Sequence, residues 1–148
     1  MPQPIYLDVC ALSRPFDDQG FARIRLETEA VNLILSGVRQ GRYTLLVSPV
    51  HLKEVEAIED PVERIELQTL MTDVGQPVSF DRHTAMTRAE GLFMAGFGIA
   101  DAAHVALAEL SKAPFISSDD RLIKKCAEHV RVVWCGNPVA FCEKEGLR

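Results

Sequence analysis

Short apolar runs alternate with stretches of helical periodicity along the 148 residues of the chain. Residues 5–7 and residues 43–47 are almost continuously apolar, as in strands that are buried on both faces. Residues 14–20 form a polar, proline-containing loop. From residue 23 to residue 39 apolar side chains recur every three or four positions, which predicts an amphipathic helix that ends before Gly41. The chain therefore opens with strand, loop, helix and strand.

The same alternation continues to the C-terminal part of the chain. Ser48 and Pro49 predict a helix N-cap and first helical residue, and the helix after them carries Glu54. We expect further helices at residues 61–72, 81–97, 100–110 and 119–128, and further strands at residues 78–80, 115–117 and 130–134. Strands separated by helices favour a mostly parallel sheet, because parallel neighbours need crossover connections. The expected fold class is α/β.

Composition narrows the class of protein. The length and an apolar content of 47% predict a single domain, residues 1–148. No window approaches the roughly 20 apolar residues that cross a bilayer, and no signal segment is visible, so we expect a cytoplasmic protein with no membrane partner. No pair of cysteines has the C-x-x-C spacing of a redox or zinc motif, which favours reduced thiols. The cysteines are Cys10, Cys126, Cys135 and Cys142.

Net charge weighs against simple nucleic-acid binding. The chain has 16 Lys and Arg against 21 Asp and Glu, a net charge of −5. This sign is wrong for a protein that holds nucleic acid mainly by releasing counterions from phosphates. An RNA substrate would require local basic patches or bound cations.

Acidic residues occupy the positions where a parallel sheet binds ligands, beyond the carboxyl ends of its strands. Asp8 follows the first strand, and Asp119 and Asp120 follow the strand at residues 115–117. Glu54 lies near the start of a helix. Three or four convergent carboxylates would suit Mg²⁺ or Mn²⁺, which prefer oxygen ligands. The pattern predicts a site for a hard cation at this edge of the sheet.

Asp101 is the most distinctive of the acids, because it is the single carboxylate within a stretch of small and apolar residues, 99–108. Each acid also has a simpler interpretation. Asp8 and Asp119 could cap a turn or a helix, Glu54 could be a solvated helix residue, and Asp101 could stabilise a helix N-terminus. Their order and placement together favour one shared site.

Four segments in this order resemble the motifs of the PIN domain, in particular those of stand-alone bacterial and archaeal proteins similar to VapC toxins. They are Tyr-Leu-Asp-Val-Cys at 6–10 with Arg-Pro-Phe-Asp-Asp at 14–18, Ser-Pro-Val-His-Leu-Lys-Glu at 48–54, Ala-Asp-Ala-Ala-His-Val-Ala at 100–106 and Ile-Ser-Ser-Asp-Asp-Arg-Leu at 116–122. The resemblance spans nearly the whole chain. It implies a three-layer α/β/α sandwich with a mostly parallel five-stranded sheet.

The resemblance also implies a site and an activity. Asp8, Glu54, Asp101 and Asp119 would be the catalytic, metal-binding set, with Ser117 beside them and Asp120 as an outer member. The implied activity is cleavage of RNA with Mg²⁺ or Mn²⁺. The implied partners are RNA, a second copy in a homodimer and a small antitoxin protein, which would make the chain the toxin of a toxin–antitoxin pair.

Our mechanistic hypothesis is that Asp8, Asp101 and Asp119 hold the cation. Glu54 would complete the shell or orient a water for in-line attack on the phosphodiester. Phosphate contacts are expected from Arg14, Arg121 and Lys124, although an ordinary solvated surface position is the better explanation for any one of them alone.

Two questions stay open at this point. His104, three residues after Asp101, is either a hydrogen-bonded packing residue or a catalytic base. The competing function is a PIN-like module that binds RNA or protein without cleavage. Phosphoacceptor and dehalogenase-type folds are disfavoured, because Val9 and Cys10 follow Asp8 where those proteins need a second acid. Metal-dependent cleavage that Asp8→Asn abolishes would distinguish enzyme from binding module.

Overall fold

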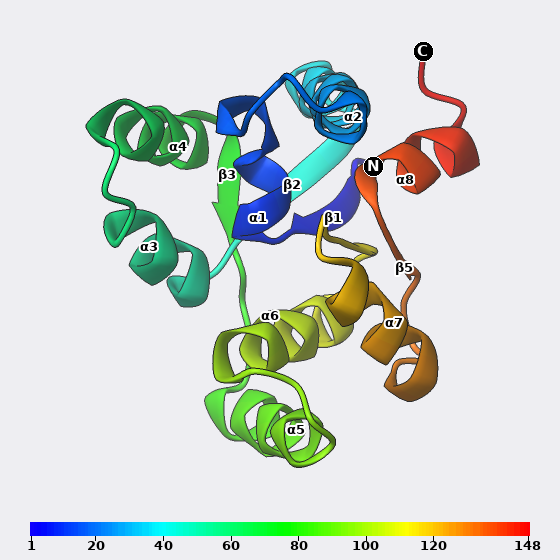
Figure 1. Cartoon of the computed structure of the whole chain (residues 1–148). Coiled ribbons are helices and arrows are strands. Elements are labelled where there is room, and N and C mark those ends of the chain that lie inside the picture. Colours follow the sequence, from blue (N-terminus) through cyan, green and yellow to red (C-terminus); the bar gives the residue numbers. More distant parts are fainter.

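A computed structural model describes all of residues 1–148. Its centre is one sheet of five strands in the order β3-β2-β1-β4-β5, and every neighbouring pair is parallel (Figure 1). The strands are β1 (Gln3–Leu7), β2 (Tyr43–Val47), β3 (Gly75–Pro77), β4 (Phe115–Ile116) and β5 (Cys135–Gly136). The predicted α/β class is confirmed, and the sheet is entirely parallel.

Helices cover both faces of the sheet. They are α1 (Val9–Leu12), α2 (Ala22–Arg39), α3 (Pro49–Glu56), α4 (Pro61–Val74), α5 (Arg82–Met94), α6 (Ile99–Leu110), α7 (Asp120–His129) and α8 (Pro138–Glu145), with a 3-10 turn at Arg14–Phe16. Alternate side chains of β1 enter different cores: Ile5 and Leu7 pack with α2, α4 and α8, whereas Tyr6 packs with α5, α6 and α7. Figure 1 shows these layers, with α5 and α6 at the bottom of the view. The result is a three-layer α/β/α sandwich.

The residue that follows each of strands β1 and β2 is the N-cap of the next helix. Asp8 ends β1, and its Oδ1 accepts the backbone N–H of Ala11 at 3.0 Å, so α1 begins at once. Ser48 ends β2 and caps α3, with Pro49 as the first helical residue. Proline at this position costs no hydrogen bond, because the first N–H groups of a helix are unpaired. The predicted start of this helix is confirmed.

The strand predicted at residues 78–80 is wrong, because the third strand lies just before it. β3 pairs with β2 in a register that places Gly75 beside Leu45 and Pro77 beside Val47. A Cβ atom on Gly75 would lie 2.4 Å from the carbonyl oxygen of Met71, so only glycine fits at the start of this strand. Backbone pairing and close packing define β3, and neither leaves an apolar pattern in the sequence.

The strand predicted at residues 130–134 is also wrong. β5 begins at Cys135, which pairs with Phe115 of β4. The apolar run before it does not pair as a strand: Val130 is buried, whereas Val132 is 68% exposed. Helices α1 and α8 had no counterpart in the sequence prediction. No helix in the structure combines the length and apolar character needed to cross a membrane.

Candidate active site

Strands β1 and β4 are neighbours in the sheet, and the chain leaves them in opposite directions. From β1 the chain continues to β2 and β3 on one side, and from β4 it continues to β5 on the other. Parallel sheets bind ligands at such a reversal, beyond the carboxyl ends of the strands. A cavity of about 90 Å³ lies there. Its lining residues are Asp8, Val9, Cys10, Glu54, Asp101, His104 and Asp119. The structure therefore brings all four predicted acids to one cavity.

Asp8 lies at the floor of this cavity and is 4% exposed. Its Oδ1 accepts the Ala11 amide at 3.0 Å and the thiol of Cys10 at 3.1 Å. Burial raises the pKa of Asp8, and hydrogen bonds from Ser117, Cys10 and Ala11 oppose that rise. Capping and membership of an acidic site, which were alternatives in the sequence, coexist in this residue.

Asp119 also combines the two roles. Its Oδ1 caps α7 by accepting the N–H groups of Arg121 at 3.0 Å and Leu122 at 3.2 Å. Its own N–H donates to Oγ of Ser117 at 3.0 Å. Ser117 is fully buried, and its hydroxyl lowers the pKa of Asp8. The serine therefore lies between the acids that follow β1 and β4.

Asp101 projects from the first turn of α6 and is half-buried. Burial raises its pKa, the negative charge of Asp119 raises it further, and His104 opposes both effects. No hydrogen bond within the chain engages this carboxylate. Both oxygens of this carboxylate are therefore free to accept hydrogen bonds from water or to contact a ligand.

Glu54 reaches the cavity from α3 and is held by His104 of α6. Nε2 of His104 hydrogen-bonds Oε1 of Glu54, and this contact lowers the pKa of Glu54 against the effect of burial. His104 itself is buried, with 1% exposure. The histidine is therefore a buried, hydrogen-bonded residue, as in the first of the two alternatives, and one of its partners is a cavity acid.

A chain of buried polar groups extends from His104 into the core. The hydroxyl of Tyr6 lies 2.5 Å from Nδ1 of His104 and 2.8 Å from Oγ of Ser48. The Ser48 amide donates to Nδ1 of His51 at 3.0 Å, so the proton of the neutral His51 ring is on Nε2, which donates to the Leu7 carbonyl at 2.6 Å. Burial lowers the pKa of His51 to about 4. No sequence motif predicts this network, because its members lie in separate elements.

Two solved structures resemble this one over most of the chain. A chain in the crystal structure of FitAcB from Neisseria gonorrhoeae superposes with a TM-score of 0.56 and 15% identity, over 90% of this chain and 97% of that chain. A chain in the structure of FitAB bound to an IR36 DNA fragment gives 0.56 and 18% identity, over 91% and 95%. No family model and no curated protein sequence matches the chain.

The likeness covers most of both chains, and it includes the parallel five-stranded sheet with its helix layers. The chain has a PIN-like fold. The fold that the four sequence motifs imply is therefore confirmed. In this PIN-like fold the four acids occupy the carboxyl edge of the sheet.

The donor set at this edge of the PIN-like fold suits a hard cation. Four carboxylates line a cavity of about 90 Å³, and hard cations such as Mg²⁺ and Mn²⁺ take carboxylate oxygens together with water. As the side chains lie in this structure, no group of three Asp, Glu, His or Cys side chains is close enough together to hold a metal ion. The types of donor suit a hard cation, and water ligands would have to complete its shell.

Asp120 and Arg14 lie outside the cavity of the PIN-like fold, in an ion-pair network on its flank. Asp120 accepts both terminal nitrogens of Arg23, at 2.5 and 2.6 Å. Arg14 donates to Glu27 at 2.8 Å and to Asp17 at 3.0 Å. A phosphate contact by Arg14 would require these ion pairs to open.

Arg121 and Lys124 lie on α7, the helix that Asp119 caps. No ion pair within the chain engages either side chain. Lys125 on the same helix donates to the Gly96 carbonyl at 2.8 Å, and its charge lowers the pKa of Asp101. Phosphate contacts by Arg121 and Lys124 stay a prediction.

Proposed function

We propose that the protein is a Mg²⁺- or Mn²⁺-dependent ribonuclease that hydrolyses RNA phosphodiester bonds. The observation that carries this proposal is the convergence of four carboxylates from separate segments on one cavity at the reversal point of a parallel sheet. Two of them, Asp8 and Asp101, have raised pKa values that burial and neighbouring charge produce. A cation in this cavity would relieve both effects.

Asp8, Asp101 and Asp119 would supply the oxygen ligands. A bound cation would lower the pKa of a coordinated water, bridge the acidic cavity to the scissile phosphate and neutralise charge on the leaving oxygen. Ser117 would help to position Asp119 through the hydrogen bond from the Asp119 amide, and its hydroxyl would favour the charged form of Asp8. This arrangement reconciles the net charge of −5 with a polyanionic substrate.

Glu54 would orient the attacking water. His104 occupies Oε1 of Glu54, which leaves Oε2 as an acceptor toward the cavity. The water oxygen would form the new bond to phosphorus and lose a proton to solvent as the bond to the leaving oxygen breaks, and a proton from solvent would neutralise the leaving oxygen. His104 is thus a positioning residue for Glu54. Arg121 and Lys124 would contact flanking phosphates from α7.

We further propose that the protein is the toxin of a toxin–antitoxin pair, bound by a small antitoxin protein and assembled as a homodimer. Support comes from the fold shared with FitB, a toxin of such a pair. The second similar structure is that of FitAB bound to a DNA fragment. The fold that this chain shares with it supports an antitoxin partner for this chain.

Two observations favour a different function, a PIN-like module that binds RNA or protein without cleavage. Glu54 is engaged by His104, and no group of three Asp, Glu, His or Cys side chains is close enough together to hold a metal ion. Such a module would keep the cavity acids as structural caps, the role that Asp8 and Asp119 also fill.

The experiment is cleavage of a mixed pool of structured RNAs with Mg²⁺, with Mn²⁺ and with chelator. Asp8→Asn and Asp101→Asn are the test variants, and Asp73→Asn, an exposed position on α4, is the matched control. Cleavage by the parent and the control that is lost with chelator and in both test variants supports the enzyme. A parent protein that binds RNA without cutting it under any condition supports the binding module.

A further inference from the structure

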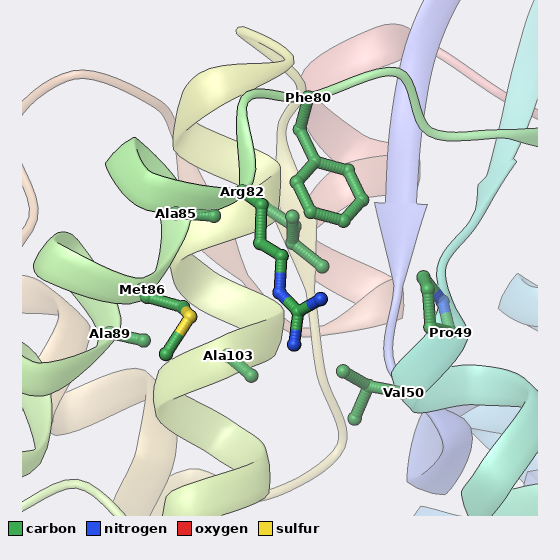
Figure 2. Close-up of a pocket in the computed structure, with 9 residues that line it drawn as sticks. Pro49, Val50, Phe80, Arg82, Ala85, Met86, Ala89 and Ala103 are labelled. Carbon is green, nitrogen blue, oxygen red and sulfur yellow. The ribbon is translucent and has the colours of Figure 1, made fainter.

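A hollow of about 450 Å³ lies between helices α3, α5 and α6, apart from the acidic cavity (Figure 2). Most of its lining residues are apolar, and one of them is charged. Pockets of this size and character, with few polar groups, are those that hold small organic groups. We call the hollow bounded by Val50, Phe80, Arg82, Met86 and Ala103 the Phe80 pocket.

Phe80 supplies an aromatic ring at the edge of this pocket. The residue is 37% exposed and directly precedes Asp81, the N-cap of α5. Oδ2 of Asp81 accepts the Thr84 amide at 2.9 Å, so the cap fixes the backbone next to Phe80. Proteins that bind single-stranded RNA stack its bases on exposed aromatic rings. A ring with a fixed backbone and an open pocket beside it suits this contact.

Arg82 is the charged residue of the pocket. Figure 2 shows its guanidinium extending between Phe80 and Val50. Arg82 has no ion-pair partner within the chain, whereas Arg88 on the same helix pairs with Glu109 at 2.7 Å. No acidic residue lines the pocket, although the net charge of the chain is −5. The pocket is therefore a local positive site, as a phosphate requires.

The Phe80 pocket and the acidic cavity adjoin each other, because the same two helices line both. Val50 and Glu54 lie one turn apart on the same side of α3, and they line the pocket and the cavity respectively. On α6, Ala103 lines the pocket and the next residue, His104, lines the cavity. The hydrogen bond between Glu54 and His104 links the helices where the two spaces adjoin. A nucleotide next to a phosphate in the cavity can therefore reach the pocket.

We propose that the Phe80 pocket binds one base of a single-stranded RNA, next to the phosphate that is cut. Phe80 stacks on the base, Val50, Met86 and Ala103 form the apolar walls, and Arg82 pairs with the phosphate of the same nucleotide. The proposal rests on the proposed function and names the part of the substrate that the chain holds beside the reacting bond. Apolar walls accept any base, so the pocket selects unpaired RNA over duplex RNA, whose bases are stacked and paired.

A second hollow along α5 lacks these features. It has a volume of about 330 Å³ and is lined by Phe93 and Glu90, with no basic residue. A carboxylate at this position repels phosphate, so the aromatic ring of Phe93 is not expected to bind RNA. An apolar side chain of a partner protein is the other occupant that the walls of the Phe80 pocket would accept. Such an occupant predicts RNA affinity that does not depend on the pocket.

The test is the RNA dissociation constant from fluorescence anisotropy, with a labelled pool of short single-stranded RNAs of random sequence. Ca²⁺, another cation that takes oxygen ligands, replaces Mn²⁺, and a gel verifies that the probe stays intact. Phe80→Ala should weaken binding by about 5- to 100-fold, the range for the loss of one stacked base. Ala103→Leu should weaken it by at least about fivefold, because the larger side chain occupies the pocket. Arg82→Ala should reduce the salt dependence by about 0.7 in the log–log slope, the value for one phosphate contact.

Two control variants should bind RNA as the parent protein does. Phe93→Ala removes an exposed aromatic ring that lines only the second hollow, and Arg39→Ala removes an exposed charge at the end of α2. Circular dichroism verifies that every variant is folded. The parent protein should also bind the single-stranded pool more tightly than a duplex of the same length.

Pocket variants that bind RNA like the parent protein, or controls that weaken binding as much as Phe80→Ala, would overturn the proposal. Cleavage with Mn²⁺ is measured on the same proteins, which separates the two claims. A parent protein that cuts RNA while the pocket variants bind it normally overturns the pocket alone. Binding that depends on Phe80 and Arg82 without any cleavage supports the pocket and overturns the nuclease. A parent protein that neither binds nor cuts RNA overturns both.

Discussion

His104 hydrogen-bonds Glu54 through Nε2, across fifty positions of sequence and between two helices that approach the same cavity. The other ring nitrogen lies 2.5 Å from the hydroxyl of Tyr6. The imidazole therefore joins a cavity acid to a buried phenol of the central strand. Partners of this kind orient ligands that would otherwise rotate freely, which is how residues that never touch a metal affect its binding.

Replacing His104 tests whether this contact matters for function. His104→Ala should lower the cleavage rate and weaken Mn²⁺ binding, each by about 10- to 100-fold, because Glu54 loses its fixed direction. Calorimetry gives the Mn²⁺ affinity, and rates at saturating metal give the effect on the chemical step. His83→Ala, at an exposed position, is the control. Unchanged affinity and rate in a folded His104→Ala protein would remove His104 from the mechanism.

Tyr6→Phe tests the buried hydrogen-bond chain. Loss of the hydroxyl leaves Ser48 and His104 short of a buried partner, so the free energy of unfolding should fall by about 1–3 kcal/mol. Tyr43→Phe is the matched control, because the Tyr43 hydroxyl donates to Glu145 at 2.8 Å nearer the surface. Its loss should cost about 0.5–1.5 kcal/mol. Urea denaturation measures both, and a smaller effect at Tyr6 than at Tyr43 would contradict a structural role for the chain of hydrogen bonds.

Asp8→Asn should stabilise the metal-free protein at neutral pH. Folding raises the pKa of Asp8, so the folded state binds this proton more tightly than the unfolded chain does. As the pH rises from the unfolded pKa of Asp8 to its higher folded pKa, the carboxyl therefore destabilises the folded state more and more. Above the folded pKa this loss of stability is complete. With chelator, the melting temperature should rise by roughly 2–4 °C at neutral pH, as expected for about 1 kcal/mol in a domain of this size.

Two further features separate this effect from general stabilisation. The gain in stability from Asp8→Asn should shrink as the pH falls from the folded pKa to below the unfolded pKa of aspartate, because the parent carboxyl is then protonated in both the folded and the unfolded state. Mn²⁺ should reverse the order of stability, since it would bind the parent protein and not the variant. An equal gain at all pH values, or no reversal with Mn²⁺, would show that Asp8 is a structural cap alone.

The edge of the sheet offers a test of the fold itself. Gly75→Ala should lower the free energy of unfolding by about 1–3 kcal/mol, because the added Cβ would overlap the Met71 carbonyl and Val47. Gly91→Ala in α5 should instead stabilise by about 0.5–1 kcal/mol, since nothing lies within reach of its Cβ and alanine favours a helix. Thermal and urea unfolding measure both. A neutral Gly75→Ala would contradict the position of β3.

The centre of this fold was easier to predict from the sequence than its edges. The apolar runs that became β1, β2 and β4 are buried on both faces, and burial is what an apolar pattern records. The edge strand β3 is Gly-Gln-Pro, so no apolar side chain marks it. It forms because its backbone pairs with β2. The other edge strand, β5, begins at Cys135, after the apolar run that was expected to form it, and Val132 in that run is exposed.

The candidate site divides in the same way. Strand ends placed Asp8 and Asp119 together, because parallel strands finish at one edge. The partners of the acids depend on the rotation of helices, which the sequence does not record. The sequence could therefore place His104 on the same side of its helix as Asp101, but it could not show that His104 contacts Glu54. It also could not show that Asp120, which adjoins Asp119, forms an ion pair with Arg23.

The proposed mechanism requires that the cavity acids hold the cation that RNA cleavage needs. One titration with Mn²⁺ addresses this requirement, in which calorimetry records binding and gel analysis records the rate of RNA cleavage, for the parent protein and Asp101→Asn. We predict one shared midpoint for binding and cleavage in the parent, and loss of both in the variant. Cleavage that does not follow Mn²⁺ occupancy, or Mn²⁺ binding that Asp101→Asn leaves unchanged, would contradict the mechanism.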